Sequence, residues 1–263
     1  EEDLGDTPHD RDHRPVRPTE AARIVHEQAA HILAGVDRLK ASMRQLMVNQ
    51  SRRFVVGVVG SIMQGSLPGM VRAFRDQAAG MEVELIELTT LEQVAALKEG
   101  RIDTGLGRIR IDDPVIERVV LTDEPLMAAL PATHPLARDY TPLSLAAFHG
   151  ETLILYPSQP RPSYADQLLS ILRDHAVRPG KIIEVREIQM ALGLVAAKSG
   201  CAIVPVSMRH FQREDVRYRP IAEDHATSPI ILGARAGNTD PAVALFRDTA
   251  RDIFAAQPSH PTP

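Results

Sequence analysis

The spacing of apolar residues divides the chain into three regions. The first 18 residues are polar and show no apolar period. From Thr19 to about Asn49 the apolar residues recur alternately four and three positions apart, which is a heptad pattern and predicts a long helix. Thr19 is a favoured N-cap residue and follows Pro18, so the helix is expected to begin there. The seam residues are Val25, Ala29, Ile32, Val36, Leu39, Met43 and Leu46.

A narrow apolar stripe with charged flanks favours a helix that pairs with a second helix. Residues 19–50 are therefore predicted to be a coiled-coil linker that dimerises the protein. The alternative is an amphipathic helix that packs on its own domain. The side chains expected in the dimer contact are Val25, Ile32, Val36, Leu39, Met43 and Leu46.

From residue 52 onward, short apolar runs alternate with helical patterns, which predicts α/β structure with parallel sheets covered by helices. The predicted strands are 54–59, 83–88, 103–106, 115–121, 152–156, 182–186, 202–204, 216–220 and 230–234, and the predicted helices are 67–77, 91–98, 163–175, 188–199 and 241–255. The pattern changes around residues 123–131, and a second series begins after a proline-rich stretch. We expect two α/β lobes joined by two crossing strands, with lobe I at about 52–124 and 228–256 and lobe II at about 125–227. Ligands of such sheets bind beyond the carboxyl ends of the strands, here between the lobes.

Composition and charge narrow the function. The chain has 263 residues, 44% of them hydrophobic, and a formal net charge of −4. A compact nucleic-acid-binding domain is usually basic, so most of this chain is not one. The local exception is the cluster of Arg11, Arg14 and Arg17. No apolar run is long enough to span a membrane, and the single cysteine excludes a disulfide framework and fits a reducing cytoplasm.

The sequence contains no catalytic constellation. Ser66 lacks the glycine two residues earlier that a nucleophile elbow requires, and Cys201 lies in an apolar run typical of an inert core thiol. His9 and His13 are four residues apart in a polar tail, where solvated side chains are favoured over a metal pair. We expect a protein that is not an enzyme and that has neither a cofactor nor a metal site.

Several segments resemble LysR-type transcriptional regulators, and together they cover almost the whole chain. Residues 11–22 (RDHRPVRPTEAA) look like the wing and the start of the linker helix in that family. Similar elements occur at 88–93 (LTTLEQ), 97–108 (LKEGRIDTGLGR), 124–126 (EPL), 130–137 (LPATHPLA) and 193–197 (GLVAA). Residues 156–163 (YPSQPRPS) and 187–189 (EIQ) resemble the branch that controls catechol and chlorocatechol breakdown.

The resemblance implies a remnant of a winged helix-turn-helix at 1–18, a linker helix at 19–50, and at 51–263 a two-lobed effector-binding domain resembling periplasmic binding proteins. It implies a small carboxylate effector similar to muconate or benzoate, a homodimer or homotetramer, and, in the full-length protein, contacts with DNA and RNA polymerase. Pro8 and His9 stand where the family has an apolar pair, and the recognition helix is missing. We therefore expect weak or no DNA binding by this chain. The rival functions are a transport-type solute-binding protein with the same fold, which the predicted coiled coil opposes, and an enzyme of unknown reaction.

A carboxylate effector requires hydrogen-bond donors and positive potential, and strand ends supply both. Thr90 and Gln93 match a capping box, which would direct backbone N–H groups toward the same region. The side chains expected at the effector from lobe I are Ser61, Gln64, Thr89, Thr90, Arg108 and Arg110, and those that the resemblance implies from lobe II are Tyr156, Pro157, Pro160 and Gln189.

Each candidate also has a purely structural interpretation. Ser61 is a common turn residue, and Thr90 could only cap its helix. Arg108 could pair on the surface with one of the acids Asp112, Asp113 and Glu117. Arg110 is expected to be solvated more than Arg108, and Tyr156 could simply bury its ring and satisfy its hydroxyl.

Overall fold

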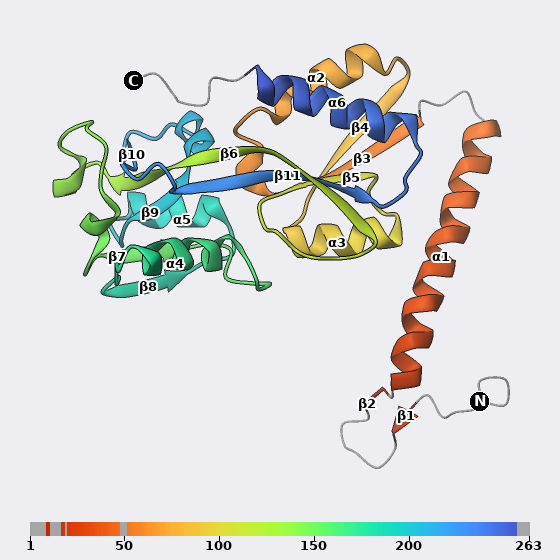
Figure 1. The fold of residues 1–263 in the computed structure, drawn as a ribbon, viewed down its shortest axis with the longest axis horizontal. Helices are drawn as coiled ribbons and strands as arrows, with labels where there is room; N and C mark the ends of the chain where they lie inside the picture. The colour runs from red at the N-terminus through yellow and green to blue at the C-terminus, as the bar shows by residue number, and fades with distance from the viewer. Residues whose placement is uncertain (1–8, 11–16, 19, 48–51, 257–263) are drawn as a thin grey trace.

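A computed structural model describes residues 9–10, 17–18, 20–47 and 52–256 and places them as two lobes and a projecting helix (Figure 1). The helices are α1 (Glu20–Met47), α2 (Leu67–Gln77), α3 (Thr90–Glu99), α4 (Tyr164–Asp174), α5 (Ile188–Ala196) and α6 (Pro241–Ala255), with short 3-10 turns η1 (Gly60–Ile62), η2 (Pro135–Ala137), η3 (Leu145–Phe148) and η4 (Val206–His210). The strands are β1 (His9–Asp10), β2 (Arg17–Pro18), β3 (Arg52–Val58), β4 (Met81–Glu87), β5 (Thr104–Gly107), β6 (Ile116–Pro131), β7 (Thr152–Leu155), β8 (Lys181–Glu184), β9 (Ala202–Pro205), β10 (Val216–Pro220) and β11 (Thr227–Arg235).

Lobe I is a sheet covered by helices on both faces. Strands β4, β3 and β5 are parallel neighbours, and β11 joins β5 and β6 in antiparallel pairing. Figure 1 shows α2 and α6 on one face and α3 on the other. Under α2 and α6 the rings of Phe54, Phe74 and Phe246 meet with centroids 4.8 to 5.4 Å apart, which anchors both helices to the sheet.

Strand β6 joins the two lobes as one continuous element. Its first half pairs with β11, and its second half lies between β10 and β9, antiparallel to both. The predicted parallel sheet holds for β4, β3 and β5, but the whole sheet is mixed, because β6 and β11 pair in antiparallel register. Residues 123–131, where the pattern changes, are the second half of strand β6. The two-lobed α/β fold with two crossing strands is confirmed.

Lobe II has its own core around β7 and β9. Strand β7 pairs with β8 in parallel, and a parallel bridge from Leu153 to Cys201 connects β7 to β9. Helices α4 and α5 contribute the buried side chains Leu168, Leu172, Leu192 and Val195 to this core. Because β7 and β8 are parallel, their carboxyl ends lie at the same edge of the lobe.

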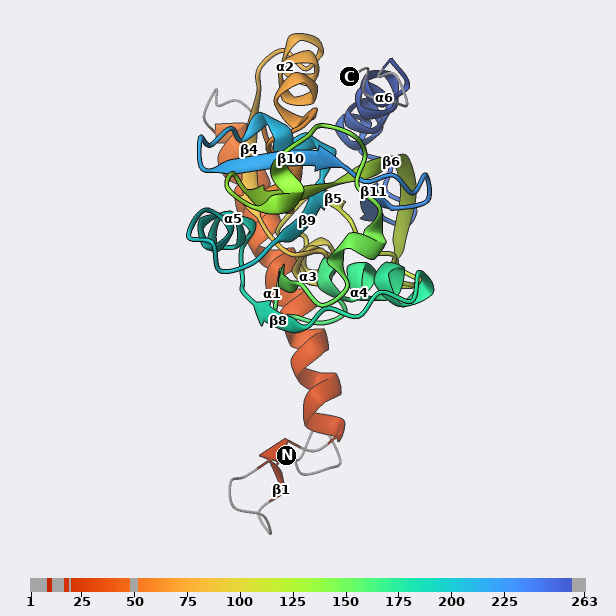
Figure 2. The same cartoon turned by 90° about the vertical axis from the view of Figure 1, so that its left-hand side faces the viewer.

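Helix α1 projects from lobe I, as Figure 2 shows from the side. The predicted helix is confirmed, and it contacts α3 through Arg38, whose Nη1 donates to the Glu99 carbonyl at 2.9 Å. The seam residues Val25, Ile32 and Val36 are 40%, 66% and 40% exposed, so α1 is not packed wholly on its own chain. The dimer contact stays a prediction. The side chains of Leu39, Met43 and Leu46, and the proposed cap Thr19, lie outside the described residues.

The wing prediction rests on the first 18 residues, of which the structure describes two short strands. Strands β1 and β2 pair in antiparallel register, His9 with Pro18 and Asp10 with Arg17. Arg11 and Arg14 lie outside the described residues. Within the described part of the chain no helix has the length and apolar character that crossing a membrane would require.

Candidate functional site

A cleft of about 230 Å³ lies between the lobes. Lobe I lines it with residues 59–61, 87–92 and 108–109, and lobe II lines it with residues 156–157, 159–160, 162–164 and 186–188. These segments follow the carboxyl ends of β3, β4, β5, β7 and β8. The cleft is therefore where the strand ends of both lobes meet, as open α/β sheets predict.

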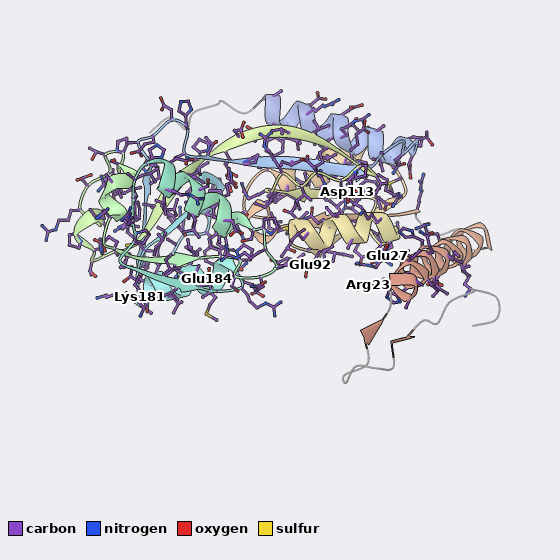
Figure 3. All side chains as sticks on the ribbon, turned by 60° about the horizontal axis from the view of Figure 1, so that its bottom comes forward. Arg23, Glu27, Glu92, Asp113, Lys181 and Glu184 are labelled. Atoms are coloured by element: carbon purple, nitrogen blue, oxygen red, sulfur yellow. The ribbon has the colours of Figure 1, made fainter. Side chains whose placement is uncertain are left out.

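The start of α3 forms one wall of the cleft. The N-cap is Thr89, whose Oγ1 accepts from the Glu92 N–H at 3.4 Å while Glu92 Oε2 accepts from the Thr89 N–H at 2.7 Å. In Figure 3, Glu92 lies at the end of α3 that faces lobe II. The positive end of the helix dipole, with its free N–H groups, is thereby directed at the cleft.

The predicted capping box of Thr90 with Gln93 was wrong by one residue. Thr90 is the first residue of the helix, and its Oγ1 accepts from the Arg108 backbone N–H at 3.2 Å. Gln93 is buried and donates from Nε2 to the Leu88 and Leu106 carbonyls at 2.9 and 3.0 Å. Its amide therefore ties α3 to the sheet, and Glu92 closes the cap.

Arg108 is held in a buried network at the junction of the lobes. It is 3% exposed, donates from Nη2 to Glu124 Oε2 at 2.7 Å and from Nε to Ser61 Oγ at 2.7 Å. Glu124 Oε1 accepts from the Ser207 backbone N–H of η4 at 2.6 Å. The surface pairing with Asp112, Asp113 or Glu117 is therefore wrong, because the partner is Glu124 on the crossing strand.

This network leaves one nitrogen of the Arg108 guanidinium unused. Its Nη1 is buried and has no hydrogen-bond partner among the described residues. Since Glu124 neutralises the guanidinium charge, Arg108 brings no free positive charge to the cleft. Through the Ser207 N–H, the same network connects lobe I, β6 and lobe II.

The wall from lobe II is built from prolines and two tyrosines. The peptide bonds before Pro157, Pro160 and Pro162 are cis. The rings of Tyr156 and Tyr164 are 5.2 Å apart, and the Tyr164 hydroxyl donates to the Ile203 carbonyl at 3.1 Å. The Tyr156 hydroxyl has no hydrogen-bond partner within the described residues, so its ring is buried as expected but its hydroxyl is unsatisfied. Burial raises the pKa of Tyr156 well above 10, which keeps the phenol neutral.

Seven of the ten predicted effector contacts line the cleft: Ser61, Thr89, Thr90, Arg108, Tyr156, Pro157 and Pro160. Three do not. Arg110 and Gln189 are exposed outside the lining, and Gln64 lies near η4, where its carbonyl is 3.1 Å from His210 Nδ1. The neighbours Glu187 and Ile188 take the place expected for Gln189.

The sequence reasoning missed Arg186, which lines the cleft just beyond β8. Arg186 is exposed and makes no ion pair in the part of the chain that the structure describes. The predicted strand extends to residue 186, whereas β8 ends at Glu184. With the observed end, Arg186 follows the carboxyl end of a strand, as Tyr156 does, and would have been a candidate.

Comparison with known proteins decides the family. Residues 49–255, nearly all of both lobes, match the family model described as LysR substrate binding domain. The chain belongs to the LysR family. This LysR-type chain is 42% identical over 249 residues to a probable cat1 operon transcriptional activator of Acinetobacter lwoffii, covering 95% of this chain and 82% of that protein.

Two solved LysR-family structures are similar to this chain. The BenM effector binding domain with its effector benzoate has a TM-score of 0.74 and 37% identity, covering 81% of this chain and 97% of that one. Full-length CbnR in complex with its target DNA has a TM-score of 0.74 and 27% identity, covering 90% of this chain and 82% of that one. The two-lobed LysR-type chain described above is therefore an effector-binding domain of a transcriptional regulator.

Proposed function

We propose that this chain senses a small aromatic or unsaturated carboxylate, of the benzoate or muconate class, between its two lobes and thereby controls genes of aromatic breakdown. One observation carries the proposal. The N–H groups that begin α3 lie at the cleft, and two further lining residues, Arg108 from lobe I and Tyr156 from lobe II, hold buried polar atoms without a hydrogen-bond partner among the described residues. Proline and tyrosine side chains supply the apolar surface that a ring or a conjugated chain requires.

The charges of the lining require that a carboxylate be held mainly by hydrogen bonds. Arg108 is neutralised by Glu124, and Glu92 is used in the cap of α3. The other charged residues of the lining are Arg186, on the opposite wall, and the acids Glu87 and Glu187. A dicarboxylate could therefore place one end at the start of α3 and the other near Arg186, whereas a monocarboxylate would use the α3 end alone.

Control of transcription further requires that the ligand favour one arrangement of the lobes over another, since equal affinity for both would shift nothing. The buried network of Ser61, Arg108, Glu124 and Ser207 spans both lobes. We propose that a dimer or tetramer formed through α1 passes the change to paired DNA-binding heads, of which residues 1–18 are the wing. The full-length protein would contact DNA and RNA polymerase in the cytoplasm.

Titration calorimetry tests the effector class. The chain is titrated with cis,cis-muconate, benzoate and, as an unrelated acid, acetate. We expect heat from muconate or benzoate, and an affinity about tenfold lower for Ser61→Ala, because a hydrogen bond to a charged group contributes about 1.5–3 kcal/mol. Ser170→Ala, on α4 and outside the cleft, is the matched control. A folded sample that binds neither muconate nor benzoate would contradict the proposal.

Two results would favour the other candidate functions. A chain that stays monomeric at high concentration while binding acids would favour a solute-binding protein. Conversion of the bound acid to a product would favour an enzyme. The relatives named above are transcriptional regulators, which supports sensing over both.

A further inference from the structure

Three potential metal-ligand side chains meet in lobe II, away from the cleft. His134 follows β6, Glu151 immediately precedes β7, and Cys201 immediately precedes β9. Their donor atoms all lie within 4.8 Å of one another, and His134 Nε2 is 3.6 Å from Glu151 Oε2. The cleft receives Tyr156 from the carboxyl end of β7, whereas Glu151 precedes its amino end, so the cluster lies at the opposite edge of the lobe.

The backbone holds this cluster in place. The Cys201 N–H donates to the Thr152 carbonyl at 2.8 Å, and the Ile154 N–H donates to the Cys201 carbonyl at 2.7 Å, which fixes Cys201 beside the start of β7. The Glu151 carbonyl accepts from Gly180 at 2.9 Å. The cluster also runs from the interior to the surface: Cys201 is 1% exposed, and the side chains of His134 and Glu151 are 20% and 36% exposed.

We propose that His134, Glu151 and Cys201 bind a zinc-class divalent cation, with the fourth coordination position open to solvent. Imidazole nitrogen, carboxylate oxygen and thiolate sulfur are the three donor types that zinc combines in tetrahedral sites. The partial exposure of Glu151 and His134 gives the ion an entry path and a position for water.

Metal binding would balance charge at this cluster. A divalent cation would compensate both the Glu151 carboxylate and the Cys201 thiolate, and the thiol proton would be released to solvent on binding.

Metal binding also has a cost at His134. Its Nδ1 accepts from the Leu136 N–H at 3.2 Å, which in the neutral ring places the proton on Nε2. Coordination through Nε2 requires the proton to move to Nδ1, so the contact with Leu136 is given up. The alternative to a metal site is a His134–Glu151 ion pair beside an inert core thiol, and the two can be distinguished spectroscopically.

Cobalt is the probe, because thiolate coordination to Co²⁺ produces a charge-transfer absorption in the near ultraviolet. Cys201 is the only cysteine of the chain, so this band reports on no other residue. We expect chelator-treated protein to develop the band on titration with Co²⁺ and to lose it when Zn²⁺ displaces the cobalt. Cys201→Ser and Cys201→Ala remove the band.

The other two ligands are tested by their effect on the same band. We expect Co²⁺ binding to weaken by more than about tenfold in His134→Gln and in Glu151→Gln. Loss of a residue that only hydrogen-bonds to a metal ligand already lowers metal affinity roughly 10–100-fold, and loss of a ligand itself should cost at least as much. His149→Gln, an exposed histidine outside the cluster, leaves binding unchanged. Circular dichroism shows that each variant is folded during the titration. The proposal is overturned if the folded parent chain shows no band at millimolar Co²⁺, or if His134→Gln and Glu151→Gln bind Co²⁺ with the affinity of the parent chain.

Discussion

Replacing Glu124 with glutamine tests whether the buried ion pair holds the lobes together. The side chains of Arg108 and Glu124 are 3% and 8% exposed, and Glu124 accepts hydrogen bonds from both Arg108 and Ser207. Glutamine keeps the shape but has one acceptor oxygen, so one of these bonds is lost and the guanidinium stays buried without its counter-charge.

The expected loss of unfolding free energy is about 3 kcal/mol, the lower end of the 3–5 kcal/mol for removing one partner of a buried ion pair, because one bond is retained. The matched control is Glu99→Gln. Glu99 pairs with Arg101 at 2.5 Å, with side chains 38% and 52% exposed, and an exposed pair contributes only about 0–1 kcal/mol. The same chemical change is thus made in a buried and in an exposed pair.

Urea unfolding followed by far-ultraviolet circular dichroism measures the difference, since the chain has no tryptophan to report by fluorescence. With a slope of about 1–3 kcal/mol/M, the midpoint of Glu124→Gln falls by about 1–3 M. The double variant Arg108→Met with Glu124→Gln is expected to recover part of the loss, because no unpaired charge remains. Equal midpoints for Glu124→Gln and Glu99→Gln would show that the pair does not stabilise the fold.

Three further predictions concern α3, α1 and the surface of lobe I. Gly107→Ala places a Cβ 2.8 Å from Thr90 Oγ1, which displaces the start of α3 and lowers the free energy of unfolding by about 1–3 kcal/mol, measured by thermal or urea unfolding. The control Gly233→Ala, whose Cβ has its nearest neighbour at 3.6 Å, is tolerated. Similar losses in the two variants would contradict the argument from crowding. Ile32→Lys raises the dimer dissociation constant, measured by analytical ultracentrifugation, roughly 100-fold, since each copy loses an isoleucine that the predicted dimer buries. The neighbouring His31→Lys leaves the dissociation constant unchanged. A parent chain that is already monomeric refutes the predicted dimer contact. The hydrogen bond from Lys98 lowers the pKa of Asp113. The parent chain is therefore slightly more stable than Asp113→Asn at pH 7, and this difference disappears as the pH falls through the lowered pKa. A stability difference that grows in acid would contradict this prediction.

The sequence by itself determined the helices and most strands, because their patterns are local. The helices at 67–77 and 241–255 and the strand at 216–220 have the predicted bounds, since each is set by an apolar period that ends at polar or proline residues. The cleft was also predictable in outline, because parallel strands bring their carboxyl ends to one edge.

Tertiary structure decided strand direction and the partners of polar side chains. Two adjacent threonines, Thr89 and Thr90, fit a capping box equally well in sequence, and the burial of Gln93 against the sheet selected Thr89. Arg108 had acids nearby in sequence, yet it pairs with Glu124, which the long strand β6 carries into the junction of the lobes. A local pattern records which residues are apolar, but a buried polar group pairs with whichever partner the chain path brings within about 3 Å.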